Sequence, residues 1–161
     1  MSRLTSKKMW GGALTATAAG VLATMTVTKD EGVRLKAYRD IVNVPTICIG
    51  ETKGVKMGDV YTREQCEAML LRRLDEFAGK VEHCIKKPMS DKVLVAFTGL
   101  AYNIGSGGFC KSTTVRLYNE GRYAEACHAM TRFNRAGGRV IPGLVSRRKR
   151  EEAMCLEGIK A

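Results

Sequence analysis

The sequence predicts an α+β fold in which a small antiparallel β lobe precedes a larger, mainly helical part. Three observations support this prediction: short apolar runs separated by turn residues at 29–61, one apolar stripe at helical spacing through 62–87, and helix-forming segments separated by glycines across 88–161. The first 28 residues, 1–28, are expected to be a separate segment. With 161 residues, the chain has room for one domain and such an appended segment.

The β lobe is predicted from two short runs, Leu35–Asp40 and Val44–Ile49, with the turn-prone residues Asn43 and Pro45 around the start of the second run. Two strands joined by so short a connection must run in opposite directions. We therefore expect a small antiparallel sheet in 29–61.

The connecting helix is expected to begin at a capping box formed by Thr62 to Gln65. Apolar residues then recur at three- and four-residue steps and end before Pro88, which is typical of one buried helix face. The residues of this stripe are Cys66, Met69, Leu70, Leu74, Phe77, Val81 and Ile85.

The C-terminal part is predicted to be entirely helical. Ser90 has the position of an N-cap for a helix that stops at Gly105, and the glycine-rich residues 105–108 are expected to form a loop. The remaining expected elements are a short helix ending at Gly121, a helix over 123–133, turns at 137–138 and 142–143, and a basic terminal helix.

The charge of the chain is strongly positive, with 27 Lys and Arg against 16 Asp and Glu and a net charge of +11. Such a surface attracts polyanions, which include nucleic acid, anionic lipid and acidic wall polymers. No DNA- or RNA-binding motif occurs, so nucleic acid is not an expected partner. The basic run Arg147–Arg150 is interpreted either as part of this attractive surface or as an ordinary solvated helix face.

The six cysteines indicate disulfides and an oxidising compartment. No Cys-x-x-Cys pair occurs, and the two histidines, His83 and His128, have no ligand-like spacing, so we expect neither a metal site nor a cofactor. Both histidines are expected on exposed helix faces. Sequence alone allows about 15 pairings, and the expected elements favour Cys84–Cys110, Cys127–Cys155 and Cys48–Cys66.

The N-terminal segment has the pattern of an export signal. Arg3, Lys7 and Lys8 precede 20 uncharged residues, Met9–Thr28. At about 1.5 Å per residue these can span a hydrocarbon core of about 30 Å. The basic flank should stay in the cytoplasm, which places residues 29–161 on the far side.

The composition of this segment favours an anchor that can leave the membrane. It contains five Ala, three Gly and five Thr but only two Leu, so little transfer free energy holds it in lipid. Two alternatives remain: a cleaved signal peptide with a site at Ala16-Thr17-Ala18, and an ordinary soluble helix.

Three residues suggest glycoside hydrolysis. That reaction needs one carboxyl group to protonate the leaving oxygen and a second to activate water or attack the sugar. Glu31, Asp40 and Thr46 could supply the two carboxyl groups and a hydroxyl that orients water. The alternative is that none of the three is catalytic: the two acids are ordinary surface residues, and the threonine occurs because it favours β-strands.

The segment around these residues resembles the catalytic signature of the phage-type lysozymes, in which Glu, eight residues, Asp, five residues and Thr follow one another. Glu31, Asp40 and Thr46 fit this pattern without a gap, and the resemblance covers nearly everything from residue 29 onward. The matching segments are EGVRLKAYRD at 31–40, PTICIG at 45–50, AYNIG at 101–105, STTVRL at 112–117 and AGGRVIPGLVSRR at 136–148.

This resemblance implies a lysozyme-like domain that hydrolyses the β-1,4 bond between N-acetylmuramic acid and N-acetylglucosamine in peptidoglycan. It makes Glu31 the general acid, Asp40 the carboxylate that holds a water for inversion, and Thr46 the hydroxyl that positions this water. One departure stands out: the family usually has His after Gly50, whereas this chain has Glu51.

The releasable N-terminal segment resembles that of the signal-anchor-release endolysins. This implies a chain that is tethered to the inner membrane through residues 9–28, faces the periplasm, and is later soluble and monomeric. Glu31 follows Thr28 by three positions, so we expect the tethered form to be inactive. The rival interpretation is a membrane-tethered cationic binding module without catalysis, in which Glu31→Gln changes nothing.

Overall fold

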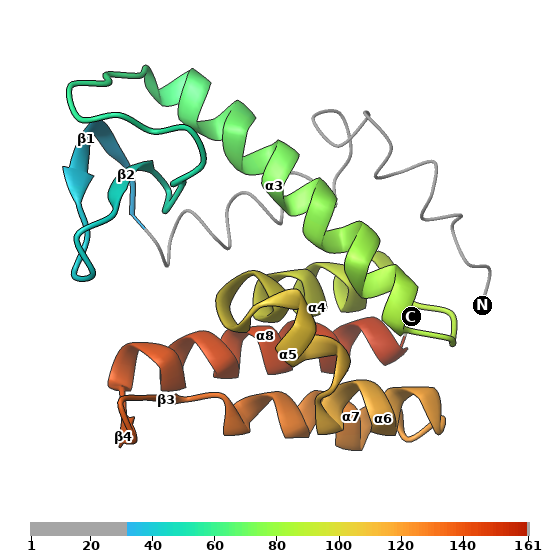
Figure 1. The fold of residues 1–161 in the computed structure, drawn as a ribbon. Coiled ribbons are helices and arrows are strands. Elements are labelled where there is room, and N and C mark those ends of the chain that lie inside the picture. Colours follow the sequence, from blue (N-terminus) through green and yellow to red (C-terminus); the bar gives the residue numbers. More distant parts are fainter. Residues whose placement is uncertain (1–31, 161) are drawn as a thin grey trace.

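A computed structural model describes residues 32–160, which form a β lobe and a helical lobe connected by one long helix (Figure 1). The candidate anchor within 1–28 and the candidate acid Glu31 lie outside the described residues. Within the described range, no helix combines the length and the hydrophobicity that a bilayer span requires.

The β lobe is built on the predicted hairpin. Strand β1 (Arg34–Arg39) pairs antiparallel with β2 (Pro45–Cys48), so that Tyr38 lies opposite Thr46. An isolated bridge between Lys36 and Val60 adds the chain before α3 to the other edge of β1. The lobe buries only a small apolar cluster, centred on Ile47, Cys48 and Cys66.

Helix α3 (Arg63–Cys84) runs from the β lobe to the helical lobe, and its start is the predicted capping box. The Thr62 hydroxyl accepts from the Gln65 amide at 3.1 Å, and the Gln65 side chain accepts from the Thr62 amide at 2.8 Å. The buried face of the helix contains Cys66, Leu70, Leu74, Ala78 and Val81, which confirms most of the predicted stripe.

The helical lobe surrounds α4, which is buried along most of its length. Ser90 and Ser112 cap α4 and α6 by accepting from backbone amides three residues on. The elements of this lobe are α4 (Asp91–Ile104), α5 (Ser106–Cys110), α6 (Thr113–Asn119), α7 (Tyr123–Ala129), the 3-10 helix η2 (Met130–Arg132), β3 (Arg135–Ala136), β4 (Arg139–Val140) and α8 (Pro142–Lys160).

Four predictions for this lobe were wrong. The glycine-rich residues 105–108, expected to be a loop, run into the short helix α5, which is stabilised by the burial of Phe109. The turn expected at 137–138 is present, but it joins two strands, so the lobe is not entirely helical; strands of two residues each are too short for any periodicity to reveal. The turn expected at 142–143 is instead the first turn of α8, where Pro142 takes the first helical position. The single helix expected over 123–133 divides into α7 and a 3-10 turn.

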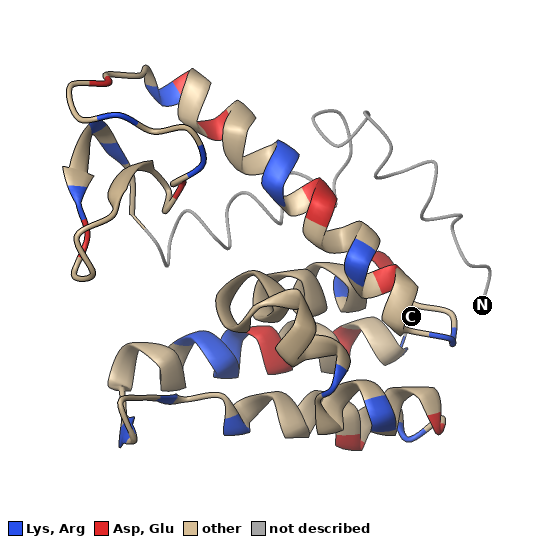
Figure 2. Ribbon diagram, in the orientation of Figure 1, with Lys and Arg blue, Asp and Glu red and all other residues tan. Residues whose placement is uncertain are grey.

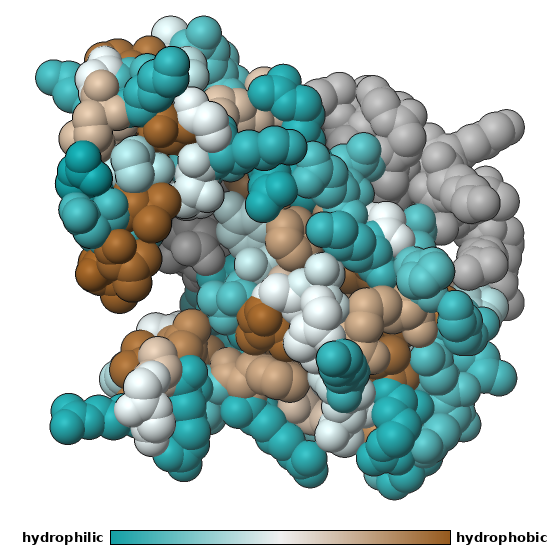
Figure 3. Space-filling view, viewed as in Figure 1, coloured by the Kyte–Doolittle hydropathy of each residue, from teal (hydrophilic) through white to brown (hydrophobic). Residues whose placement is uncertain are grey.

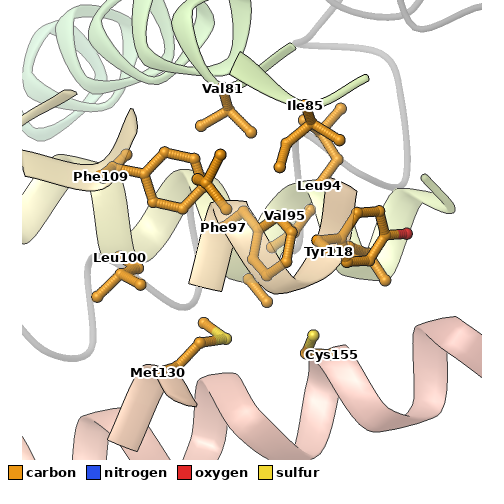
Figure 4. Close-up of a cluster of buried hydrophobic side chains, with 14 of the residues drawn as sticks. Val81, Ile85, Leu94, Val95, Phe97, Leu100, Phe109, Tyr118, Met130 and Cys155 are labelled. Carbon is orange, nitrogen blue, oxygen red and sulfur yellow. The ribbon is translucent and has the colours of Figure 1, made fainter. Parts of the chain in front are cut away.

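The main apolar core lies where α3, α4, α5 and α6 meet α8 (Figure 4). Phe97 of α4 is at its centre and packs against Phe109 and Tyr118, with ring centroids 5.6 and 5.2 Å apart. Interlocking rings of this kind add stability beyond the area that they bury. The helical lobe therefore has a core of its own.

Three disulfides connect elements that are far apart in the sequence, and they are the three pairs favoured by the sequence. Cys48–Cys66 joins β2 to α3, Cys84–Cys110 joins α3 to α5, and Cys127–Cys155 joins α7 to α8. Each bond closes a loop, which lowers the entropy of the unfolded chain.

Candidate active site

Asp40 holds together the turn between β1 and β2. Its Oδ1 atom accepts from the amides of Val42 and Val44, both at 2.9 Å, while its own amide donates to the Val44 carbonyl at 3.1 Å. Asn43 completes the turn with a φ of 66°, a left-handed conformation that Asn tolerates well. The carboxylate is therefore held by Oδ1, and within residues 32–160 no hydrogen bond is made to Oδ2.

Thr46 lies just beyond the same turn, on β2, and is buried. Its hydroxyl donates to the Val44 carbonyl at 2.9 Å. Because a hydroxyl has one proton and two lone pairs, this bond leaves Thr46 able to accept a hydrogen bond.

Val44 therefore connects the two candidate residues through its peptide groups. Its amide binds the Asp40 carboxylate and its carbonyl accepts from the Thr46 hydroxyl. This arrangement brings Asp40 and Thr46 to the same turn with defined orientations. Glu31, the third candidate, lies outside the described residues.

A hollow opens beside this turn, between the tip of the β lobe and the β3–β4 end of the helical lobe (Figure 3). The β1–β2 turn lies on one side of it and the start of α8 on the other. A hollow between two lobes is the usual location for a binding site of an extended ligand.

Glu51, which replaces the histidine of the family pattern, stabilises the chain just after β2. Its Oε1 accepts from the amides of Thr52 and Lys53, both at 2.9 Å, and its Oε2 lies 3.7 Å from the Arg73 guanidinium on α3. The contact with Arg73 attaches this turn to the connecting helix, while the backbone bridge between Ile47 and Glu51 closes the turn itself. A carboxylate thus organises this turn.

Two tyrosines near the candidate site, Tyr38 and Tyr102, have different surroundings. The Tyr102 hydroxyl donates to the Ile49 carbonyl at 2.6 Å, and its ring packs edge-on against Phe77 at 5.5 Å. Tyr102 therefore ties α4 to the β lobe. Tyr38 lies under the Arg34 guanidinium, 4.3 Å from the ring centroid.

The basic run of α8 is not the exposed surface that either interpretation assumed. Arg147 and Arg148 are buried against Glu151. Arg147 Nε lies 3.3 Å from Glu151 Oε1, and Arg148 Nε lies 2.7 Å from Glu151 Oε2. Arg148 also donates to Asn103 Oδ1 at 2.9 Å. Burial raises the pKa of the Glu151 carboxyl, and the two guanidinium groups oppose this shift. Of the four residues in this run, Lys149 alone is exposed, and Arg150 is half-buried.

The buried cluster of Arg147, Arg148 and Glu151 was not predicted because pairs three or four residues apart are common on exposed helix faces. The missing information is on α4, where Gly99 leaves room for Glu151: a Cβ atom there would lie 3.0 Å from Glu151 Oε1. His83 and His128 are exposed on helices, as expected, and His128 pairs with Glu152 at 2.5 Å.

Comparison with known proteins gives one consistent family. A family model described as phage lysozyme matches residues 28–151. The SAR-endolysin of Pseudomonas phage phiKMV is 41% identical over 157 residues, which cover 94% of this chain and 93% of that protein. The SAR-endolysin of Enterobacteria phage P21 is 38% identical over 129 residues, covering 80% and 78%.

Solved structures agree with this result. The endolysin from Escherichia coli O157:H7 phage FAHEc1 superposes with a TM-score of 0.77 and 30% identity, covering 88% of this chain and 92% of that one. These matches favour an enzyme over the rival cationic binding module, and they confirm the mainly helical lysozyme-like fold. The chain therefore belongs to the phage lysozyme family and is a glycoside hydrolase that lyses peptidoglycan.

Proposed function

We propose that Glu31, Asp40 and Thr46 together hydrolyse the β-1,4 bond between N-acetylmuramic acid and N-acetylglucosamine. The observation that carries this proposal is the shared attachment of Asp40 and Thr46 to the peptide groups of Val44. Two side chains held on one turn can bind a single water molecule with a fixed orientation.

The hydrogen-bond capacities of the two side chains suit that role. With Oδ1 held by backbone amides, Asp40 Oδ2 is able to accept a proton from water. Thr46 Oγ1 donates to a carbonyl and so accepts from the second proton of the same water. The water oxygen then presents a lone pair to the anomeric carbon.

The reaction balances with Glu31 as the acid. Glu31 gives its proton to the glycosidic oxygen as the bond to the anomeric carbon breaks. Water attacks that carbon from the opposite face and transfers its proton to Asp40, giving inversion. Glu31 ends deprotonated and Asp40 ends protonated. Proton exchange with solvent then returns both carboxyl groups to their starting forms.

The proposed chemistry is tested by new reducing ends released from purified peptidoglycan. We expect Glu31→Gln to abolish release, and Thr46→Val, which keeps the shape but removes the hydroxyl, to lower the rate by roughly 100-fold or more, the range of one general acid–base contact. A matched control is Thr52→Val, which removes an exposed hydroxyl in the same lobe. If Glu31→Gln released reducing ends at the wild-type rate, Glu31 would lose the role of acid.

We further propose that residues 9–28 first tether the chain to the inner membrane, facing the periplasm, and that it is released intact as a monomer. Support comes from the 20 uncharged residues after a basic start, and from relatives named SAR-endolysin that match over most of their length. In the tethered state Glu31 would lie three residues from lipid, so we expect activity only after release.

The tether is tested by fractionating cells that express the full chain. We expect the protein in the membrane fraction at first and in the soluble periplasm later, with an unchanged mass of 17.7 kDa. A periplasmic product lighter by roughly 2 kDa would instead indicate a cleaved signal peptide. Full activity in the membrane-bound fraction would contradict inhibition by tethering.

A further inference from the structure

Two apolar patches lie on either side of the hollow, and neither has a partner among the described residues. The hairpin patch consists of Ile41, Val42 and Val44 in the turn between β1 and β2; Ile41 is fully exposed and Val42 is 71% exposed. The β4 patch consists of Val140 and Ile141, which are 48% and 37% exposed. Figure 3 shows hydrophobic atoms on both sides of the hollow.

The residues around both patches are basic. The hairpin patch follows Arg34, Lys36 and Arg39 on β1, and Asp40 is the single acid in the sequence from 32 to 50. The β4 patch is flanked by Arg135 and Arg139, both exposed, and the sequence from 132 to 150 contains no acid at all. Figure 2 shows these cationic positions on the two hairpins.

This combination fits the interface of an anionic bilayer. Aliphatic side chains enter the boundary between head groups and acyl chains, while adjacent Lys and Arg side chains pair with anionic head groups. A glycan strand fits less well, because sugars are bound mainly through hydrogen bonds and flat aromatic faces, and neither patch contains an aromatic residue.

The proposed tether keeps the hairpin patch close to the membrane. Arg34, where β1 begins, is six residues after Thr28, a reach of at most about 21 Å. A patch held so near lipid binds at a high effective concentration, so that even a weak contact is occupied.

We propose that the hairpin patch and the β4 patch dock together onto the anionic bilayer while the chain is tethered. This inference rests on the proposed tether and adds a second membrane contact to it. In the docked state the hollow between the patches faces lipid head groups, and a glycan strand has no access to Asp40. Release therefore opens the hollow as well as freeing the N-terminal segment.

The test uses the full chain reconstituted in phosphatidylglycerol vesicles that contain lipid brominated on the acyl chains. Trp10→Phe removes the one tryptophan of the sequence, and single reporters are then introduced as Ile41→Trp, Val140→Trp or Met57→Trp. Met57 is the matched control, because it is 48% exposed, apolar and next to a lysine, but lies in the connection between β2 and α3.

We expect the lipid to quench more than half of the emission from positions 41 and 140 and almost none from position 57. Adding Ile41→Asp to the Val140→Trp reporter should weaken docking roughly tenfold or more, the value of burying one large aliphatic side chain. Replacing phosphatidylglycerol with phosphatidylcholine should weaken it as well.

Flotation of the same samples separates the tether from the docking. If the chain floats with the vesicles while the tryptophan emission from positions 41 and 140 is not quenched, the tether is retained and the docking proposal is wrong. A chain that does not float overturns both. Reporters that respond to soluble glycan strands and not to vesicles would assign the patches to the substrate, which also overturns the proposal.

Discussion

The two lobes are stabilised in different ways. The β lobe has a small apolar cluster and is shaped by hydrogen bonds from backbone amides to Asp40 and Glu51, together with one disulfide. The helical lobe has an extended core and buries the ion pairs of Arg147 and Arg148 with Glu151, next to Gly99 of α4. The proposed catalytic residues Asp40 and Thr46 lie on the lobe with the smaller core, so we expect substitutions there to reduce activity and substitutions in the helical lobe to reduce stability.

The largest effect on stability is expected from Glu151→Gln. This change keeps the shape of the side chain but removes the carboxylate charge that the buried guanidinium groups of Arg147 and Arg148 both contact, which costs about 3–5 kcal/mol. Thermal unfolding should show a midpoint lower by roughly 10 °C. The adjacent Glu152→Gln, whose partner His128 is exposed, is the control and should change the midpoint by no more than a few degrees.

The next prediction compares the disulfide of the β lobe, Cys48–Cys66, with one of the helical lobe, Cys127–Cys155. Replacing either Cys48 and Cys66 or Cys127 and Cys155 by alanines should cost about 3 kcal/mol, because the closed loops span 18 and 28 residues. Only the first pair should also lower the specific activity of the folded protein, since Cys48 lies two residues from Thr46 on β2. Equal specific activity in both variants would remove the distinction between the lobes.

A smaller effect is expected where α8 contacts α4. Gly158→Ala would place a Cβ atom 2.7 Å from Ser90 Oγ and 2.8 Å from the Val93 amide nitrogen, so we expect a loss of about 1–3 kcal/mol by overpacking. Gly79→Ala on α3 has open space and should instead gain about 0.5–1 kcal/mol. Urea unfolding of the two variants measures the free energy of unfolding, which should fall for Gly158→Ala and rise for Gly79→Ala.

The smallest effect concerns pH and an exposed ion pair of the helical lobe. The hydrogen bond from Lys92 Nζ at 2.6 Å lowers the pKa of Glu157, so the folded state binds protons less readily than the unfolded chain. The stability that this ion pair contributes to the folded state is complete above the ordinary pKa of 4.5, and it is lost as the pH falls through the lowered pKa of Glu157. The stability deficit of Lys92→Gln should therefore shrink below about pH 4.5 and stay constant above it.

The sequence predicted the features that depend on local patterns. Thr62 and Gln65 identified the start of α3, Ser90 that of α4, and Asn43 the turn that holds Asp40. It did not predict α5, whose helix depends on the burial of Phe109 by distant elements, or the burial of Arg148, which depends on Gly99 in another helix. Such features arise from contacts between segments far apart in the chain, and the periodicity of apolar residues within one segment does not reveal these contacts.

The role of Glu51 shows the same limit within the candidate site. The sequence marked it as a departure from the family pattern, but its two backbone partners and its contact with Arg73 became clear only from the folded turn. The pairing of Asp40 with Thr46 through Val44 was likewise not deducible from spacing.

The most direct measurement compares Asp40→Asn with Asp59→Asn for reducing-end release and for the thermal midpoint in the same preparations. Both residues are half-buried acids of the β lobe that accept backbone amides, at 2.9 Å for Asp40 and 2.8 Å for Asp59. We expect Asp40→Asn to lose roughly 1,000-fold or more in activity with a midpoint close to that of Asp59→Asn, which should stay active. Equal activity of the two variants would contradict a catalytic role for Asp40 and leave it as a turn-stabilising residue.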